Sequence, residues 1–108
     1  MWVMTTQGFY SAVADRDDPG SVIVRARTRG DIEALRKQIP GIRPFADPSA
    51  DYRHRAVVSK ADWVAALADL AAEIDYDNFK SAVARAQGAG RAHVYGAVWS
   101  DLLPLQAD

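Results

Sequence analysis

Arginines are the residues of this chain whose spacing most directly predicts a chemistry. Arg25 and Arg27 alternate along one predicted strand, and Arg53 and Arg55 alternate along another. Because side chains two residues apart lie on the same face of a strand, neighbouring strands with matched faces would gather these guanidinium groups on one surface. Such a surface binds phosphate backbones, and an exposed Tyr10 beside it would stack on nucleic-acid bases. The alternative is an ordinary solvated face whose arginines pair with carboxylates.

Histidines are the second group with possible chemistry. His54 and His93 could act as acid and base in a phosphodiester cleavage that needs no metal, if the fold brings both imidazoles to one phosphate. The alternative is that His54 is a buried, hydrogen-bonded histidine on a strand and that His93 lies on the surface of the last helix. The chain has no motif that activates a serine nucleophile. Catalysis is therefore not the function that we expect.

Acidic residues cluster in the segment Asp75-Tyr76-Asp77-Asn78. Carboxylate and amide oxygens are ligands for Mg²⁺ or Ca²⁺. The same residues also suit the start of a helix, with Asp75 as N-cap, because free amide groups and the helix dipole attract negative charge. No calcium-loop spacing follows and the chain contains no cysteine. We therefore expect neither a metal site nor a cofactor.

The C-terminal third is dense in large apolar side chains. A helix over 91–103 would carry one stripe of valine and leucine and, beside it, a second stripe made of Tyr95, Trp99 and Leu103. One stripe is enough to pack against the domain. The second stripe either widens the core or stays exposed as a protein interface, where Trp and Tyr are favoured. It is the protein-interface candidate of this chain.

Strands and turns that must position these groups follow from alternation and from glycine and proline. Strands are predicted over 9–14 and 21–28, joined by a turn that contains Pro19-Gly20, and over 52–59. In the 52–59 strand, one face is expected to carry Tyr52 and His54 together with two apolar residues. A short edge strand is predicted over 42–45, since Pro44 bars a central place in a sheet.

Helices are predicted over 31–39, 60–74, 75–87 and 91–103. The second begins with Ser59-Lys60-Ala61-Asp62, which has the pattern of a capping box. Gly88-Ala89-Gly90 separates the last two helices, and Pro104 ends the chain's helical part. Whether 2–6 extends the first strand or forms its own is left open by the pattern.

The order of elements predicts an α+β fold. Moving the first strand to the end gives strand, helix, strand, strand, helix, strand, which is the order of a ferredoxin-like domain. We therefore expect a permuted ferredoxin-like antiparallel sheet with helices on one face, followed by two extra C-terminal helices. With 108 residues and no linker, the whole of 1–108 is expected to be a single domain.

Four segments resemble a family of small uncharacterised bacterial proteins, a domain of unknown function. They are MWVMTTQGFYS at the start, ADYRHR over 50–55, IDYDNFK over 74–80 and RAHVY over 91–95. The resemblance spans nearly the full length. It implies a stand-alone bacterial domain and brings no activity, ligand or catalytic residue.

Composition limits the remaining choices. The net charge of −1 names no partner, no apolar segment is long enough to cross a membrane, and the lack of cysteine fits a reducing cytoplasm. We expect a cytoplasmic, non-enzymatic regulatory or adaptor module that contacts a protein partner or forms a homo-oligomer. The alternatives are an RNA- or DNA-binding protein that uses the arginines and, after it, a phosphodiesterase that uses the two histidines.

Overall fold

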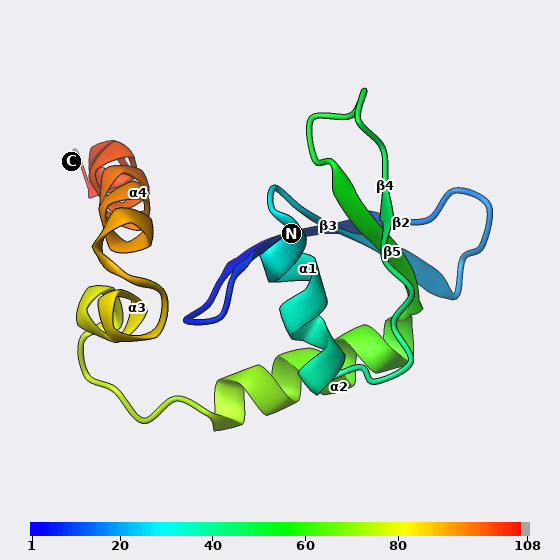
Figure 1. Cartoon of the computed structure of the whole chain (residues 1–108), viewed down its shortest axis with the longest axis horizontal. Coiled ribbons are helices and arrows are strands. Elements are labelled where there is room, and N and C mark those ends of the chain that lie inside the picture. Colours follow the sequence, from blue (N-terminus) through cyan, green and yellow to red (C-terminus); the bar gives the residue numbers. More distant parts are fainter. Residues whose placement is uncertain (107–108) are drawn as a thin grey trace. The chain divides into compact units, whose positions relative to one another are not determined.

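The computed structural model describes residues 1–106 (Figure 1). By its internal contacts the chain divides into two compact units, Met1–Ile74 and Asp75–Asp108. The first unit contains the sheet and two helices, and the second contains two further helices. In the part of the chain that is described, no helix is long and apolar enough to cross a membrane.

The sheet of the first unit has five strands, all paired antiparallel in the order β1-β2-β3-β5-β4. The strands are β1 (Trp2–Met4), β2 (Phe9–Ala14), β3 (Ser21–Ala26), β4 (Phe45–Ala46) and β5 (His54–Ser59). The strand β1 is therefore a strand of its own, which forms a hairpin with β2.

The two helical segments of this unit are α1 (Arg29–Ala34), which continues as the 3₁₀ turn η1 (Leu35–Lys37), and α2 (Lys60–Ala72). With β1 set aside, β3, α1, β4, β5 and α2 follow in ferredoxin-like order, and β2 stands ahead of them instead of after them. The predicted α+β, ferredoxin-like fold in permuted order is thus confirmed.

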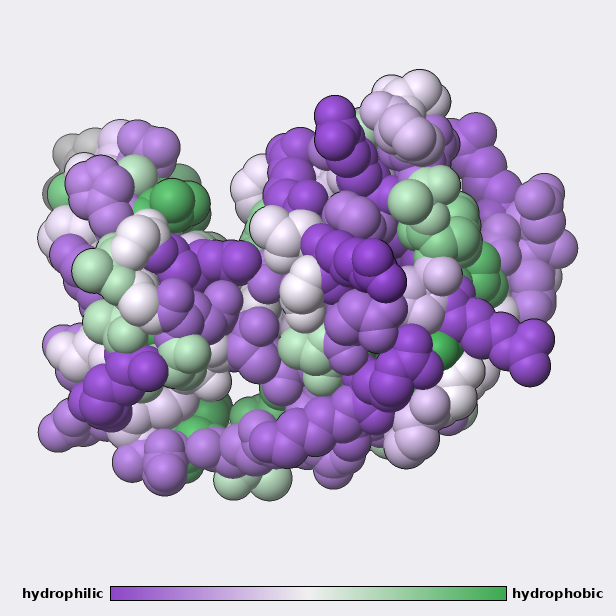
Figure 2. Space-filling view, viewed as in Figure 1, coloured by the Kyte–Doolittle hydropathy of each residue, from purple (hydrophilic) through white to green (hydrophobic). Residues whose placement is uncertain are grey.

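Both helices pack on one face of the sheet, as predicted. Ile32 and Leu35 from the α1–η1 segment and Trp63 from α2 join one core cluster with Val24 and Tyr10, and none of these side chains is more than 4% exposed. The start of α2 is fixed by Ser59, whose Oγ accepts a hydrogen bond of 3.0 Å from the backbone N–H of Asp62, as the capping pattern predicts. Figure 2 shows that the visible surface of this unit is largely hydrophilic.

A buried polar cluster joins the β1–β2 turn to α1. Asp31 is 4% exposed, and its carboxylate accepts a hydrogen bond of 3.0 Å from the backbone N–H of Phe9. The backbone carbonyl of Asp31 accepts a second bond, of 2.9 Å, from the hydroxyl of Tyr10. Gly8 leaves room for this cluster, since a Cβ at that position would lie 2.9 Å from Cγ of Asp31. Glycine at this position therefore allows the close packing.

The second unit is a helical hairpin of α3 (Phe79–Gln87) and α4 (Ala89–Asp101), followed by the 3₁₀ turn η2 (Leu103–Gln106). The prediction that Asp75 caps α3 is wrong. Asn78 is the N-cap, and its Oδ1 accepts a hydrogen bond of 2.9 Å from the N–H of Ser81. Gly88 joins the helices at φ 97° and ψ 169°, a conformation that residues with a side chain rarely adopt.

Candidate functional site

The sheet face opposite α1 and α2 carries the arginines that the sequence predicts to gather. Arg25 on β3 and Arg55 on β5 are direct cross-strand partners. The same row extends through Ser11 on β2 to Trp2 on β1, and through Arg55 to Phe45 on β4. We call this surface the arginine face. The condition stated in the sequence analysis, that the two strands are neighbours with matched faces, is met for Arg25 and Arg55.

Arg25 is the central residue of the arginine face and is half-buried. Its Nη2 donates a hydrogen bond of 2.6 Å to the hydroxyl of Ser11, which is only 1% exposed. The guanidinium carbon lies 4.7 Å from the centre of the Tyr52 ring, a cation–π distance. Its Nε is buried without a hydrogen-bond partner in the described structure. Arg25 thus combines a buried anchor with unused hydrogen-bonding capacity.

Tyr52 is a residue whose role sequence reasoning missed. It precedes β5 rather than belonging to it, and it lies on the arginine face, not beside His54 as the alternation predicts. Its ring contacts Phe9 at 6.4 Å between centroids, and the guanidinium of Arg27 lies 4.1 Å from its centre. With two arginines and a phenylalanine around it, the ring is only 5% exposed. The available sequence signal was an aromatic residue, Tyr52, close to the arginine-bearing strands.

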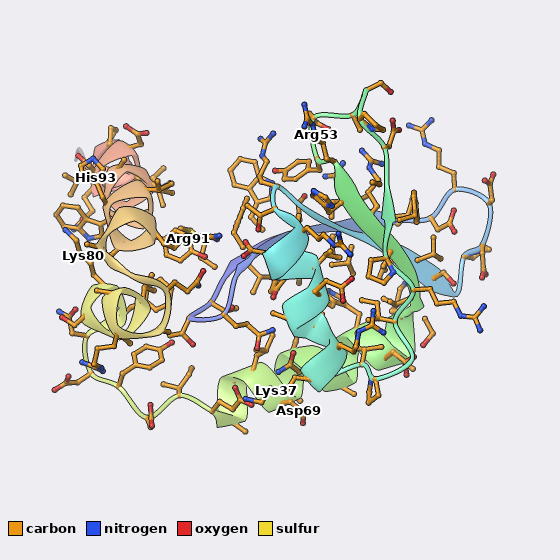
Figure 3. All side chains as sticks on the ribbon, in the orientation of Figure 1. Lys37, Arg53, Asp69, Lys80, Arg91 and His93 are labelled. Atoms are coloured by element: carbon orange, nitrogen blue, oxygen red, sulfur yellow. The ribbon has the colours of Figure 1, made fainter. Side chains whose placement is uncertain are left out.

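The remaining arginines differ in how tightly they are held. Nη1 of Arg27 donates a bond of 2.7 Å to the backbone carbonyl of Asp51. Nε of Arg55 donates a bond of 3.0 Å to the backbone carbonyl of Tyr52, and its Nη2 lies 3.7 Å from the Asp51 carboxylate. Arg53 is exposed and directly precedes β5 (Figure 3). The face therefore contains three partly engaged guanidinium groups with one carboxylate beside them.

Tyr10 does not lie on this face. Its side chain is fully buried on the helix side of the sheet, where its ring meets that of Trp63 edge-on at 6.3 Å. It is therefore not available for stacking on a base, contrary to the sequence-based expectation. Phe9 and Tyr10 give each face of β2 an aromatic residue, so alternation alone does not tell which of the two faces the helices cover.

The two histidines lie in different units. His54 is half-buried at the start of β5, and His93 is exposed on α4 (Figure 3). Neither unit by itself holds both imidazoles, so the structure of each unit supplies no acid–base pair. In the described residues, no three histidine or acidic side chains come together as a metal site would require. Asn78 of the acidic turn is used to cap α3.

The interface candidates on α4 separate into a buried and an exposed part. Tyr95 is 6% exposed and stacks on Phe79 of α3, with 5.8 Å between centroids and 10° between planes. Beyond Tyr95, no residue from 96 to 106 is buried. Trp99 is 68% exposed and Leu103 is 45% exposed. The large exposed apolar residues of this unit, which we call the α4 surface, are Val94, Trp99, Leu102, Leu103 and Leu105.

Two turn aspartates have perturbed acidity. Hydrogen bonds from the Ser21 hydroxyl and the Gly20 N–H hold the pKa of Asp18 below its usual value. Ser49 acts in the same way on the pKa of Asp47, through its hydroxyl and its backbone N–H. Both carboxylates are exposed and stabilise loops, the β2–β3 turn and the segment after β4. They are structural groups outside the candidate surfaces.

Comparison with known proteins gives no family. No protein-family model, no curated protein and no solved structure matches this chain. The arginine face and the α4 surface are therefore the features from which a function can be inferred.

Proposed function

We propose that this chain is a non-enzymatic regulatory or adaptor module that acts through protein contact, and that it associates with a second copy of itself through the α4 surface. The observation that carries the proposal is the exposure of Trp99, at 68%, in the half of α4 that has no buried residue. Large exposed apolar patches on small proteins mark interaction sites, and tryptophan is the residue most enriched at interface centres.

The occupant that best fits this surface is a second α3–α4 hairpin. The second unit spans 34 residues, from Asp75 to Asp108. Units below about 40 residues usually need a staple or oligomerisation for stability. Between Ala92 and Leu105 the sequence contains no lysine or arginine and one acidic residue, Asp101. Two copies of such a surface can therefore meet about a twofold axis with little charge repulsion.

The area of the α4 surface is sufficient for a dimer. A large apolar side chain presents on the order of 200 Å². Since the five residues are 45% to 80% exposed, they leave on the order of 600 Å² of apolar surface on each copy. Complete burial of all five residues on both copies would give at most about 1,200 Å², which only reaches the lower end of the range for specific interfaces. We therefore expect a dimer that dissociates on dilution.

Sedimentation velocity of the whole chain, from low micromolar to submillimolar concentration, tests the proposal. We expect a concentration-dependent shift from monomer to dimer that persists at high salt, because apolar contact is not screened. Leu102→Glu, which places a charge at the centre of the α4 surface, is expected to leave a monomer. A chain that sediments as a monomer at every concentration contradicts self-association.

Nucleic-acid binding is the second candidate, and the pairing of Arg25 with Arg55 across β3 and β5 favours it. An electrophoretic shift assay with mixed-sequence RNA and single-stranded DNA, at low and physiological salt, tests this alternative. Arg53→Gln together with Arg55→Gln is the informative variant, because it spares Arg25 and its buried Ser11 partner. Loss of a salt-sensitive shift in this variant supports the alternative, and no shift at low salt rejects it.

A further inference from the structure

The strand β5 is paired along only part of one edge. On one side it pairs with β3 over all six residues, from His54 to Ser59. On the other side β4 contributes only Phe45 and Ala46, which lie opposite Arg55 and His54. From Ala56 onward the structure describes no strand on this side. Between that point and the start of α2, β5 has a short free edge.

The register shows which backbone groups point to the free edge. In an antiparallel pair, hydrogen-bonded and non-hydrogen-bonded residue pairs alternate. The N–H of Lys60 donates to the carbonyl of Gly20 at 2.8 Å, so even-numbered residues of β5 bond toward β3. The N–H of Asp47 donates to the carbonyl of Arg53 at 2.8 Å, so odd-numbered residues bond toward β4. The N–H and C=O of Val57 therefore point to the side that β4 leaves open.

A groove of about 280 Å³ lies directly beside this edge. Its lining is mixed: polar groups share it with the core residues Ile39, Ile42 and Val58, each of which is at most 7% exposed. Asp62 is the single charged residue among those that line it. Val57, Ser59 and Ala65 also line it.

The wall opposite Val57 is held by hydrogen bonds. Nη1 of Arg36 donates a bond of 3.0 Å to the carbonyl of Ile42, and the N–H of Ile42 donates one of 3.0 Å to the carbonyl of Ile39. Figure 1 shows this segment leaving η1, passing the start of α2 and rising to β4. Both backbone groups of Ile42 therefore already have hydrogen-bond partners within the protein.

We propose that this groove binds an extended peptide segment, which adds to the β5 edge as a short strand. Its backbone would pair with the N–H and C=O of Val57, as in other cases where a peptide extends a sheet. Residues opposite each other in a sheet point to the same face. The peptide residue opposite Val58 would therefore place its side chain on the helix side, beside Ile39 and Ile42, and should be apolar.

Length and charge define the partner further. The free edge spans Val57 to Ser59, since α2 begins at Lys60. A peptide of three or four extended residues fits this length, whereas β5 of a second copy would bring its own β4 with it. Asp62 disfavours an acidic residue in the groove and favours a basic residue next to the apolar one. The proposal is independent of self-association, which uses the second unit.

Selection of a random heptapeptide display library against the whole chain, followed by calorimetric titration of the selected synthetic peptides, tests the proposal. The decisive variant is Val57→Pro, because proline removes the outward N–H and breaks no bond to β3. Val57→Thr is its matched control, with the same branching and the N–H retained. Ala65→Leu fills the groove from an exposed position on α2 without weakening the helix.

We expect extended peptides with one apolar residue, bound about five- to tenfold more weakly by Val57→Pro and with unchanged affinity by Val57→Thr. Ala65→Leu should abolish binding of the same peptides. If thermal melting shows that Val57→Pro does not fold, the result for Ala65→Leu decides the test. Failure to enrich any peptide overturns the proposal, as does binding that is unaffected by both variants. A change in oligomeric state on Val57→Pro, with no peptide bound, would assign the edge to a second copy instead.

Discussion

Substitution of Trp99 by alanine is the sharpest test of the proposed self-association. Trp99 is 68% exposed, and a tryptophan side chain presents about 250 Å². If about half of its exposed surface is buried in a dimer, each copy contributes about 2 kcal/mol at about 25 cal/mol per Å². A twofold dimer contains the residue twice, so Trp99→Ala should cost about 4 kcal/mol, or a roughly 10²- to 10³-fold increase in the dissociation constant.

Sedimentation equilibrium at several loading concentrations measures this change directly. Trp2→Ala is the matched control, because Trp2 is 74% exposed but lies on β1 in the first unit. The control should associate as the parent chain does. An increase in the dissociation constant of less than about threefold for Trp99→Ala would contradict self-association through Trp99, since that change is below 1 kcal/mol. Equal weakening by Trp2→Ala would show that association does not depend on the α4 surface.

Three further substitutions test the fold and its turns. Gly88→Ala should lower the free energy of unfolding by about 1–3 kcal/mol in chemical denaturation, because Gly88 has φ 97°. Its control is Gly90→Ala, since Gly90 lies in helical backbone with open space around it. This control should raise the free energy of unfolding by about 0.5–1 kcal/mol. Gly8→Ala should cost about 1–3 kcal/mol in the same assay, since its Cβ would lie 2.9 Å from a buried carboxyl. Ser21→Ala should raise the pKa of Asp18 toward its usual value in an NMR titration. Because the folded pKa of Asp18 is lowered, its ionised form stabilises the turn above the unfolded value of 3.8, and this contribution is lost as the pH falls through the folded pKa.

Local patterns predicted the elements of this fold well. Three signals that act over a few residues are the capping residues before α2, the alternation in β2 and β3, and the proline–glycine turn between these strands. They predict the order of strands and helices from which the permuted ferredoxin-like sheet follows. The start of α3 was wrong because Asp75 and Asn78 are both good caps. The choice between them depends on where Phe79 packs, and its ring stacks on Tyr95, sixteen residues later in the chain.

The positions of the aromatic residues could not be predicted from local patterns. Tyr10 is buried because its hydroxyl finds the carbonyl of Asp31 and its ring meets Trp63, and both partners are distant in sequence. Tyr52 lies on the arginine face because Arg25 and Arg27 cover its ring. For both tyrosines, either face of the sheet could bury an aromatic ring. Neither the composition nor the alternation of the sequence shows which face is used. Alternation places Arg25 and Arg55 on one face only because β3 and β5 are neighbours in the matching register.

The free edge of β5 depends both on a sequence signal, Pro44, and on the register of β4 with β5, which the sequence does not show. Pro44 predicts that the neighbouring strand is short and at an edge, and β4 does begin only at Phe45. A proline has no backbone N–H to donate to a neighbouring strand, which is consistent with β4 beginning only after Pro44. That alone does not create a binding edge. Because Phe45 pairs with Arg55, the next outward-facing residue on β5 is Val57, and its backbone groups meet the groove. A register shifted by one residue would direct those groups toward β3, and the same groove would lie beside an edge with no free donor at its centre.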